Sequence, residues 1–102
     1  MDQRVDLGRL DGLTLAEEVF ETLHAARGAV VERIVSNGQQ TQWYDQDHDE
    51  WVMVLSGAAR LDVGGREVEL GPGQALTIAA RVRHRVLWTA RPTIWVAVHF
   101  PA

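Results

Sequence analysis

Short segments rich in β-branched and aromatic residues alternate with glycine-containing turns from Val30 to Phe100, and this series limits the fold more than any other feature. Such segments at regular spacing are typical of β-strands. Gly64-Gly65 separates two alternating segments and predicts a two-residue hairpin. Strands are expected at 30–35, 51–55, 61–63, 68–70, 75–79, 82–89 and 93–100. We therefore predict an all-β sandwich or closed barrel.

The segment before this series has a different pattern. Thr14 and Glu17 have the spacing of a capping box, and Gly28 is placed to end a helix. Between them lies an apolar stripe at helical spacing, formed by Val19, Phe20, Leu23 and Ala26. We therefore expect a short amino-terminal helix that covers the barrel, preceded by a loose arm up to about Gly12.

Length and charge narrow the possible functions. A chain of 102 residues fits one domain, which we expect to comprise an arm and helix over 1–28 and a barrel over 30–100. The net charge of −4 argues against nucleic acid and anionic membranes as partners. With no cysteine, any metal ion would need nitrogen and oxygen ligands. Because neither a signal peptide nor a membrane span is visible, a cytoplasmic location is expected.

Two segments carry polar side chains toward the expected interior. In the strand that follows Arg81, alternation sends His84 and its apolar neighbours to one face and the arginines to the other. Glu50 stands directly before an apolar strand, with Tyr44 and Gln46 shortly ahead of it. A carboxylate is costly to bury unless it contacts a metal ion, an arginine or a proton. The alternatives are an ordinary core histidine and a surface carboxylate in an acidic turn.

The spacing of these residues resembles the two sequence motifs of the cupin superfamily. The motifs read Gly38-x5-Tyr44-x-Gln46-x3-Glu50-x6-Gly57 and Gly73-x5-Ala79-x-Arg81-x2-His84-x3-Trp88. Shorter strings, such as Trp43-Tyr44-Asp45-Gln46 and His84-Arg85-Val86, resemble those of small, stand-alone bacterial cupins. The resemblance implies a jelly-roll barrel, usually paired as a homodimer.

The resemblance also implies a metal site, but with half of its ligands changed. Metal-binding cupins use two histidines and a glutamate from the first motif and one histidine from the second. Here the glutamate corresponds to Glu50 and the second-motif histidine to His84, whereas the two remaining histidines correspond to Tyr44 and Gln46. A neutral glutamine oxygen binds late first-row divalent ions less strongly than imidazole does. The expected ion (iron, manganese, nickel or zinc), held by Gln46, Glu50 and His84, would bind with lower affinity or not at all.

Four other side chains are candidates for contacting a bound small molecule. Tyr44 would be a polar anchor beside the carboxylate. His48 would contribute if the turn before the apolar strand bends inward, and His99 would do so if its face of the last strand is the inner one. Among the tryptophans, Trp88 is expected to stack on a ligand at the barrel mouth.

Several functions remain open from the sequence. One is a metal-dependent cupin that acts on a small oxygenated molecule. Another is a metal-free cupin that binds or senses a small molecule through the same residues. A third is acid–base catalysis by Glu50 and Tyr44 without a metal ion. The continuously apolar strand 51–55 is expected to be buried on both faces, with a second subunit covering the outer one.

Overall fold

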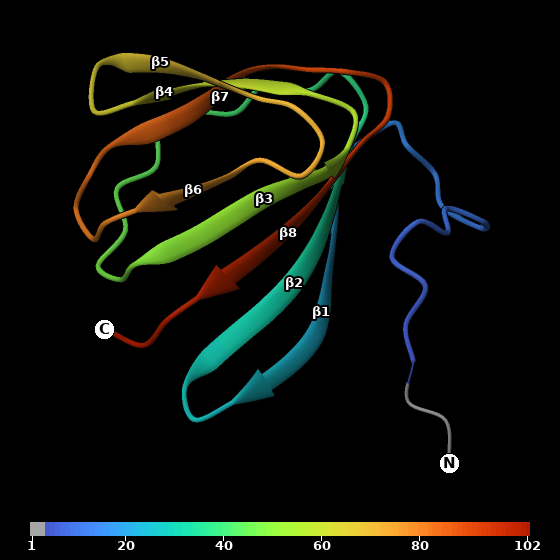
Figure 1. Ribbon diagram of the computed structural model, residues 1–102, viewed down its shortest axis with the longest axis horizontal. Helices are drawn as coiled ribbons and strands as arrows, with labels where there is room; N and C mark the ends of the chain where they lie inside the picture. Colours follow the sequence, from blue (N-terminus) through green and yellow to red (C-terminus); the bar gives the residue numbers. More distant parts are fainter. Residues whose placement is uncertain (1–3) are drawn as a thin grey trace.

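The computed structural model describes residues 4–102, and within them the chain forms eight β-strands and no helix (Figure 1). The strands are β1 (Val19–Ala26), β2 (Ala29–Ser36), β3 (Glu50–Ser56), β4 (Ala59–Val63), β5 (Arg66–Leu70), β6 (Ala75–Ile78), β7 (His84–Thr89) and β8 (Thr93–His99). The predicted all-β class is confirmed. Over the same residues, the structure holds no helix of the length and apolarity that a membrane span requires.

The strands form two antiparallel sheets that face each other as a jelly-roll barrel (Figure 1). The larger sheet has the order β1-β2-β8-β3-β6, and the smaller one has the order β5-β4-β7. The segment before β3 lies against the smaller sheet, because Tyr44 and His84 exchange two backbone hydrogen bonds of 2.7 and 3.1 Å. This bridge brings the two motif segments, far apart in the sequence, side by side.

The expected hairpin around Gly64-Gly65 is confirmed. Val63 at the end of β4 pairs with Arg66 at the start of β5, so the turn holds only the two glycines. Their φ angles are 59° and 91°. A two-residue turn of this hand needs positive φ at both positions, which glycine adopts without steric cost.

The expected amino-terminal helix is wrong, because this segment is strand β1. It pairs with β2 from Val19 opposite Val35 to Ala26 opposite Ala29. Gly28, predicted to end a helix, instead forms a tight hairpin turn with Arg27, and their φ angles are 80° and 53°. The local apolar spacing fits a helix, but pairing along the whole length of β2 supplies backbone hydrogen bonds and overrides it.

The hydrophobic core lies between the two sheets. Val52, Val54, Trp95 and Ala97 of the larger sheet pack with Leu61 of the smaller one. The buried indole of Trp95 donates a hydrogen bond of 3.0 Å to the Ser36 hydroxyl, which satisfies its polar nitrogen. This packing forms one end of the barrel interior and leaves space at the other end.

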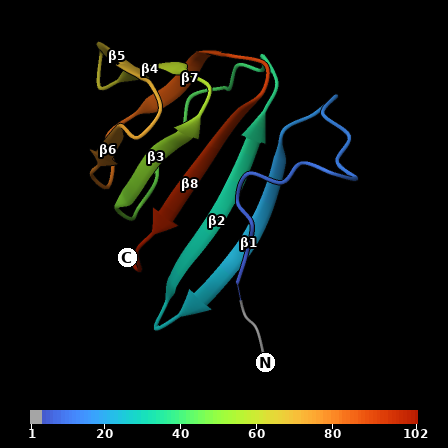
Figure 2. The same ribbon diagram turned by 45° about the vertical axis from the view of Figure 1, so that its right-hand side comes forward.

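The amino-terminal arm lies along the outer face of the larger sheet (Figure 2). Arg33 of β2 points to this face and is only 6% exposed. Its guanidinium donates hydrogen bonds of 3.0 and 2.6 Å to the carbonyls of Leu7 and Arg9, and one of 2.7 Å to Glu21. The arm is therefore attached to the sheet through one buried side chain.

Strand β3 is not buried equally on its two faces. Val52 and Val54 point inward and are buried, whereas Trp51, Met53 and Leu55 point outward and are half-buried in the single chain. The expectation of burial on both faces is therefore not met within one chain.

Candidate functional site

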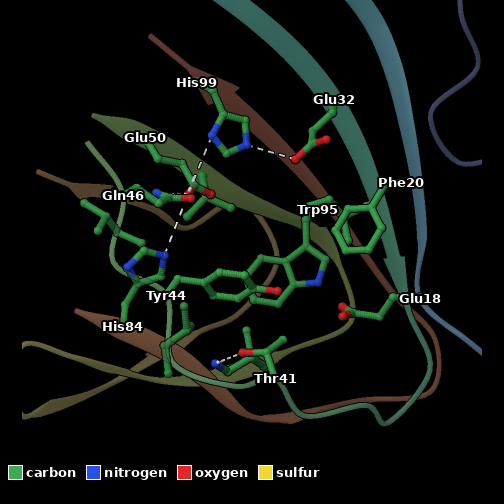
Figure 3. Close-up of a pocket in the computed structure, with 15 residues that line it drawn as sticks. Glu18, Phe20, Glu32, Thr41, Tyr44, Gln46, Glu50, His84, Trp95 and His99 are labelled. Atoms are coloured by element: carbon green, nitrogen blue, oxygen red, sulfur yellow. Dashed lines mark hydrogen bonds and ion pairs between the residues drawn. The ribbon is translucent and has the colours of Figure 1, made fainter. Parts of the chain in front are cut away.

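A cavity of about 140 Å³ lies between the two sheets (Figure 3). Its walls combine aromatic and aliphatic side chains with a group of polar ones. The lining includes the polar side chains of Glu32, Tyr44, Gln46, Glu50, His84 and His99. A concave, largely apolar space with a few convergent polar groups is the usual form of a small-molecule site, and this one is open to solvent on the side of Phe20 and Tyr44, which are 56% and 44% exposed.

Glu50 is the centre of the polar group. As the first residue of β3, it lies opposite His99 of β8 in the antiparallel register, and it is only 8% exposed. Gln46 Nε2 donates a hydrogen bond of 3.0 Å to Glu50 Oε1. His84 Nε2 lies 3.8 Å and His99 Nδ1 3.9 Å from the same oxygen. Three nitrogens from three chain segments therefore surround one buried carboxylate oxygen (Figure 3).

His84, at the start of β7, is 5% exposed and is held in a defined orientation. Its Nδ1 lies 3.0 Å from the carbonyl oxygen of Val82, so the hydrogen sits on Nδ1 and the lone pair of the neutral ring on Nε2. Tyr44 stacks on the ring, with centroids 5.6 Å apart. Because Nε2 and the Glu50 oxygen are too far apart for a direct hydrogen bond, a ligand amine with two N–H donors can bond to both of them.

His99 belongs to a chain of hydrogen bonds that runs from the cavity to the surface. Its Nε2 lies 2.9 Å from Glu32 Oε1, and its Nδ1 lies 3.0 Å from His48 Nε2. His48 Nδ1 in turn lies 3.1 Å from Asp47 Oδ1. These three bonds need three ring hydrogens, whereas two neutral imidazoles carry only two. The network is therefore complete when one extra proton is bound.

The electrostatic environment of the site favours the extra proton that completes this network. The hydrogen bond to Glu32 raises the pKa of His99 above its ordinary value of 6.5, and the charges of Glu50 and Glu32 add to the effect although burial opposes it. The pKa of Tyr44 is raised above 10.0, first by burial and then by the charges of Glu18, Glu50 and Glu32. Tyr44 is therefore a neutral phenol at neutral pH.

A pH titration should detect the raised pKa of His99. Its extra binding of a proton in the folded state stabilises the protein fully below pH 6.5, and this contribution is lost as pH rises through the raised pKa. In Glu32→Gln the pKa of His99 is expected to fall back toward its ordinary value. NMR titration of the His99 ring signals in both proteins measures this difference. Equal titration midpoints in the two would contradict the assigned role of Glu32.

The structure brings together most of the side chains that the sequence singles out. Tyr44, Gln46, Glu50, His84 and His99 all line the cavity. His48 is not part of the lining but contacts His99 from behind, so it acts on the cavity only through that ring.

Trp88 is placed outside the cavity. It is 46% exposed and pairs with Arg60 on the outer face of the smaller sheet. A register irregularity, after which Leu61 pairs with Val86, inserts one extra residue into β7 and reverses the direction of the side chains beyond it. The expected stacking of Trp88 on a cavity ligand does not fit this position.

Three residues of the cavity wall were missed by the sequence reasoning. Glu32 comes from β2, whereas Glu18 and Phe20 come from the segment expected to be helical. Alternation in β2 places Glu32 on the same face as Ile34 and Ser36, which could have marked it as inward-facing. For Glu18 and Phe20 the wrong secondary structure removed any such signal.

The polar group does not fit the divalent ion that the cupin resemblance implies. Gln46 presents its amide nitrogen, not its ligating oxygen, to Glu50. The Nδ1 atom of His99 is already engaged by His48. Within residues 4–102, no group of three or more histidine, aspartate or glutamate side chains has the arrangement of a metal site.

Comparison with known structures connects this geometry to known proteins. The chain is similar to a candidate mannose-6-phosphate isomerase from Ralstonia eutropha JMP134, with 39% identity over 97% of this chain and 98% of that chain and a TM-score of 0.87. A protein from Thermus thermophilus shares the fold at 22% identity over 98% of both chains, with a TM-score of 0.83. A comparison with curated proteins gives no match.

The sequence of this chain also matches the model of a protein family. The model of the cupin domain matches residues 30–99, which run from β2 to the last residue of β8. This match includes Glu50, His84 and the segment between them. Because it spans well over half of the chain, the protein belongs to the cupin domain family.

Proposed function

We propose that this cupin binds a small polar molecule in the cavity between its sheets, and that it does so without a metal ion. The observation that carries the proposal is the arrangement around Glu50 Oε1, with Gln46 Nε2 at 3.0 Å, His84 Nε2 at 3.8 Å and His99 Nδ1 at 3.9 Å. Buried polar groups are costly unless they have partners. A ligand placed between Glu50 and His84 would provide them with one.

The same groups have the properties needed for proton transfer. Glu50 can accept a proton, a neutral His84 can accept one at Nε2, and the neutral phenol of Tyr44 can donate one. The name of the Ralstonia protein points to isomerisation of a sugar phosphate. A phosphate dianion, however, would meet the carboxylates of Glu18, Glu32 and Glu50 in this cavity. We therefore do not extend that substrate to this chain.

Ligand-observed NMR tests the proposal. Saturation-transfer spectra with a set of small polyols, amines and carboxylates are expected to identify binders whose signal disappears in Glu50→Gln and His84→Gln. Glu67→Gln, an exposed carboxylate of β5 that is not part of the cavity wall, is the matched control and should retain every signal. Compounds that keep their saturation-transfer signal in both Glu50→Gln and His84→Gln would show that the ligand binds outside the cavity.

A divalent ion held by Gln46, Glu50 and His84 is the second candidate. It is favoured by the approach of Glu50 Oε1 and His84 Nε2 to 3.8 Å, because a shift of about 0.4 Å would bring them to the separation of two ligands that bind one tetrahedral ion at about 2.1 Å. Binding of this ion would require the Gln46 side chain to rotate so that its amide oxygen, not its nitrogen, faces the ion. Elemental analysis of untagged protein, after incubation with manganese, iron, nickel and zinc, decides between the two. We expect far less than one ion per chain, and near-stoichiometric metal that is lost in Glu50→Ala and His84→Ala would establish the second candidate.

We further propose a cytoplasmic homodimer that does not bind nucleic acid, in keeping with the net charge of −4. The half-buried side chains of Trp51 and Met53 lie on the outer face of the larger sheet, where a second copy would cover them. Size-exclusion chromatography with light scattering should give twice the chain mass of 11.4 kDa. A single-chain mass at micromolar concentration would contradict the dimer.

A further inference from the structure

The charges around the cavity are strongly unbalanced. Three carboxylates line it, those of Glu18, Glu32 and Glu50, and none of the lining residues that the structure describes is an arginine or lysine. Within this lining, the groups that can carry a compensating charge are the imidazoles of His84 and His99. Even with His99 protonated, the ionised carboxylates leave the cavity with a net negative charge.

Each carboxylate is held in place while keeping one oxygen available. Ser36 Oγ donates a hydrogen bond of 2.6 Å to Glu18 Oε2. Glu32 and Glu50 each use Oε1, in contacts of 2.9 Å with His99 Nε2 and 3.0 Å with Gln46 Nε2. The second oxygen of each carboxylate takes no part in these bonds. The protein thus positions three carboxylates, and of these only Glu32 is hydrogen-bonded to an imidazole that can carry a compensating charge.

Aromatic side chains form the rest of the wall near these charges. Phe20, Tyr44 and Trp95 come from three different segments and all line the cavity (Figure 3). The face of an aromatic ring carries a negative partial charge and attracts cations. The imidazole of His84, more than nine-tenths buried, adds its Nε2, which lines the same space and forms no hydrogen bond with Glu50 at 3.8 Å.

We propose that the cavity selects a small organic ammonium ion, which the carboxylates of Glu18, Glu32 and Glu50 and the rings of Phe20, Tyr44 and Trp95 would surround. This inference rests on the proposed function and specifies its ligand class. An anion would be repelled by three carboxylates, and a neutral polyol could donate hydrogen bonds to them but would leave their net charge uncompensated. An ammonium ion gains from both the carboxylates and the aromatic faces. The pKa of Tyr44 is raised first by burial, and the negative charges of Glu18, Glu50 and Glu32 raise it further.

Choline and 3,3-dimethylbutan-1-ol form a suitable pair of probes, because they have the same shape and differ in replacing the charged nitrogen by carbon. Titrations of each into the untagged protein, followed by protein NMR, should show shifts of the His84 and Tyr44 ring signals. Choline is expected to bind at least about tenfold more tightly than its carbon analogue, the ratio that a desolvated cation–aromatic contact alone supplies. Added salt should weaken the binding of choline but not the binding of its carbon analogue.

Isosteric variants separate charge from shape. Glu18→Gln and Glu32→Gln should each weaken choline binding about three- to tenfold while leaving binding of the carbon analogue unchanged. Glu67→Gln removes the same charge outside the cavity wall and should leave both affinities unchanged. Equal affinity for the two probes in the wild type would overturn the inference but leave the proposed function intact. If neither probe, nor any compound of the NMR set, shifts the cavity signals at millimolar concentration, both fail.

Discussion

Replacing Arg33 with alanine is expected to detach the amino-terminal arm and to lower the free energy of unfolding by about 3 to 5 kcal/mol. The guanidinium is buried and binds the Leu7 and Arg9 carbonyls as well as the Glu21 carboxylate. Its loss leaves Glu21 without its ion-pair partner and two carbonyls without a donor. Urea unfolding followed by tryptophan fluorescence measures the change in stability.

Arg9→Ala is the matched control for this prediction. Among residues 4–102, the side chain of Arg9 pairs with Asp11 alone, and the two are 69% and 80% exposed. Such an exposed pair contributes less than about 1 kcal/mol, so stability should hardly change. Hydrogen exchange of residues 7–13 provides a second measurement, because it should become faster in Arg33→Ala alone. An unchanged exchange rate there would mean that Arg33 does not hold the arm.

Gly57→Ala is expected to lower the free energy of unfolding by about 2 to 5 kcal/mol, because a side chain at this position meets fixed backbone. Gly57 has a φ of 87°, and a Cβ atom would lie 2.6 Å from the carbonyl oxygen of Pro92 and 2.8 Å from the Thr93 Cα. Thr93 is fully buried at the start of β8 and cannot move away easily. The cavity residues of β8 would shift with it.

Gly65→Ala isolates the cost of the backbone conformation alone. Gly65 has a φ of 91°, but nothing lies within 4 Å of the position that a Cβ atom would take. A left-handed conformation at a non-glycine residue costs about 1 to 2 kcal/mol, so this variant should be clearly more stable than Gly57→Ala. Thermal unfolding of the two variants makes the comparison. Equal losses of stability in Gly57→Ala and Gly65→Ala would show that the contact with Pro92 and Thr93 does not contribute to the destabilisation.

In the function proposed above, the cavity lies where the cupin resemblance places a metal site but has a different chemistry. Tyr44 and Gln46 stand where metal-binding cupins have histidines, and Gln46 uses its amide to hold Glu50. His99 enters the site from β8 and is oriented by Glu32 and His48. These exchanges favour an organic ligand with hydrogen-bonding or cationic groups over a directly coordinated ion.

Strands β2 to β8, and the faces of most of their side chains, follow from local patterns in the sequence. Successive side chains of a strand point to opposite faces, so the alternation around His84 predicts its inward direction without knowledge of the rest of the chain. The same holds for the hairpin at Gly64-Gly65, where only glycine adopts both backbone conformations freely. The motif spacing that carries Glu50 into the barrel is a local property as well.

The partners of these side chains depend on pairing between distant strands, which no local pattern contains. Glu32 and His99 are 67 positions apart and meet only because β2 and β8 are neighbours in the larger sheet. The change of register near Arg60 turns Trp88 outward although local alternation predicts the opposite.

The amino-terminal segment shows the same limit most clearly. Its apolar spacing suits a helix, but the exposed edge of β2 offers a full set of backbone hydrogen bonds, and the segment becomes β1. This choice carries Glu18 and Phe20 to the cavity wall. The sequence by itself therefore determined strands β2 to β8 and the inward direction of Glu50 and His84, whereas only tertiary pairing decided β1 and which charges surround the site, because backbone pairing joins residues far apart in the chain.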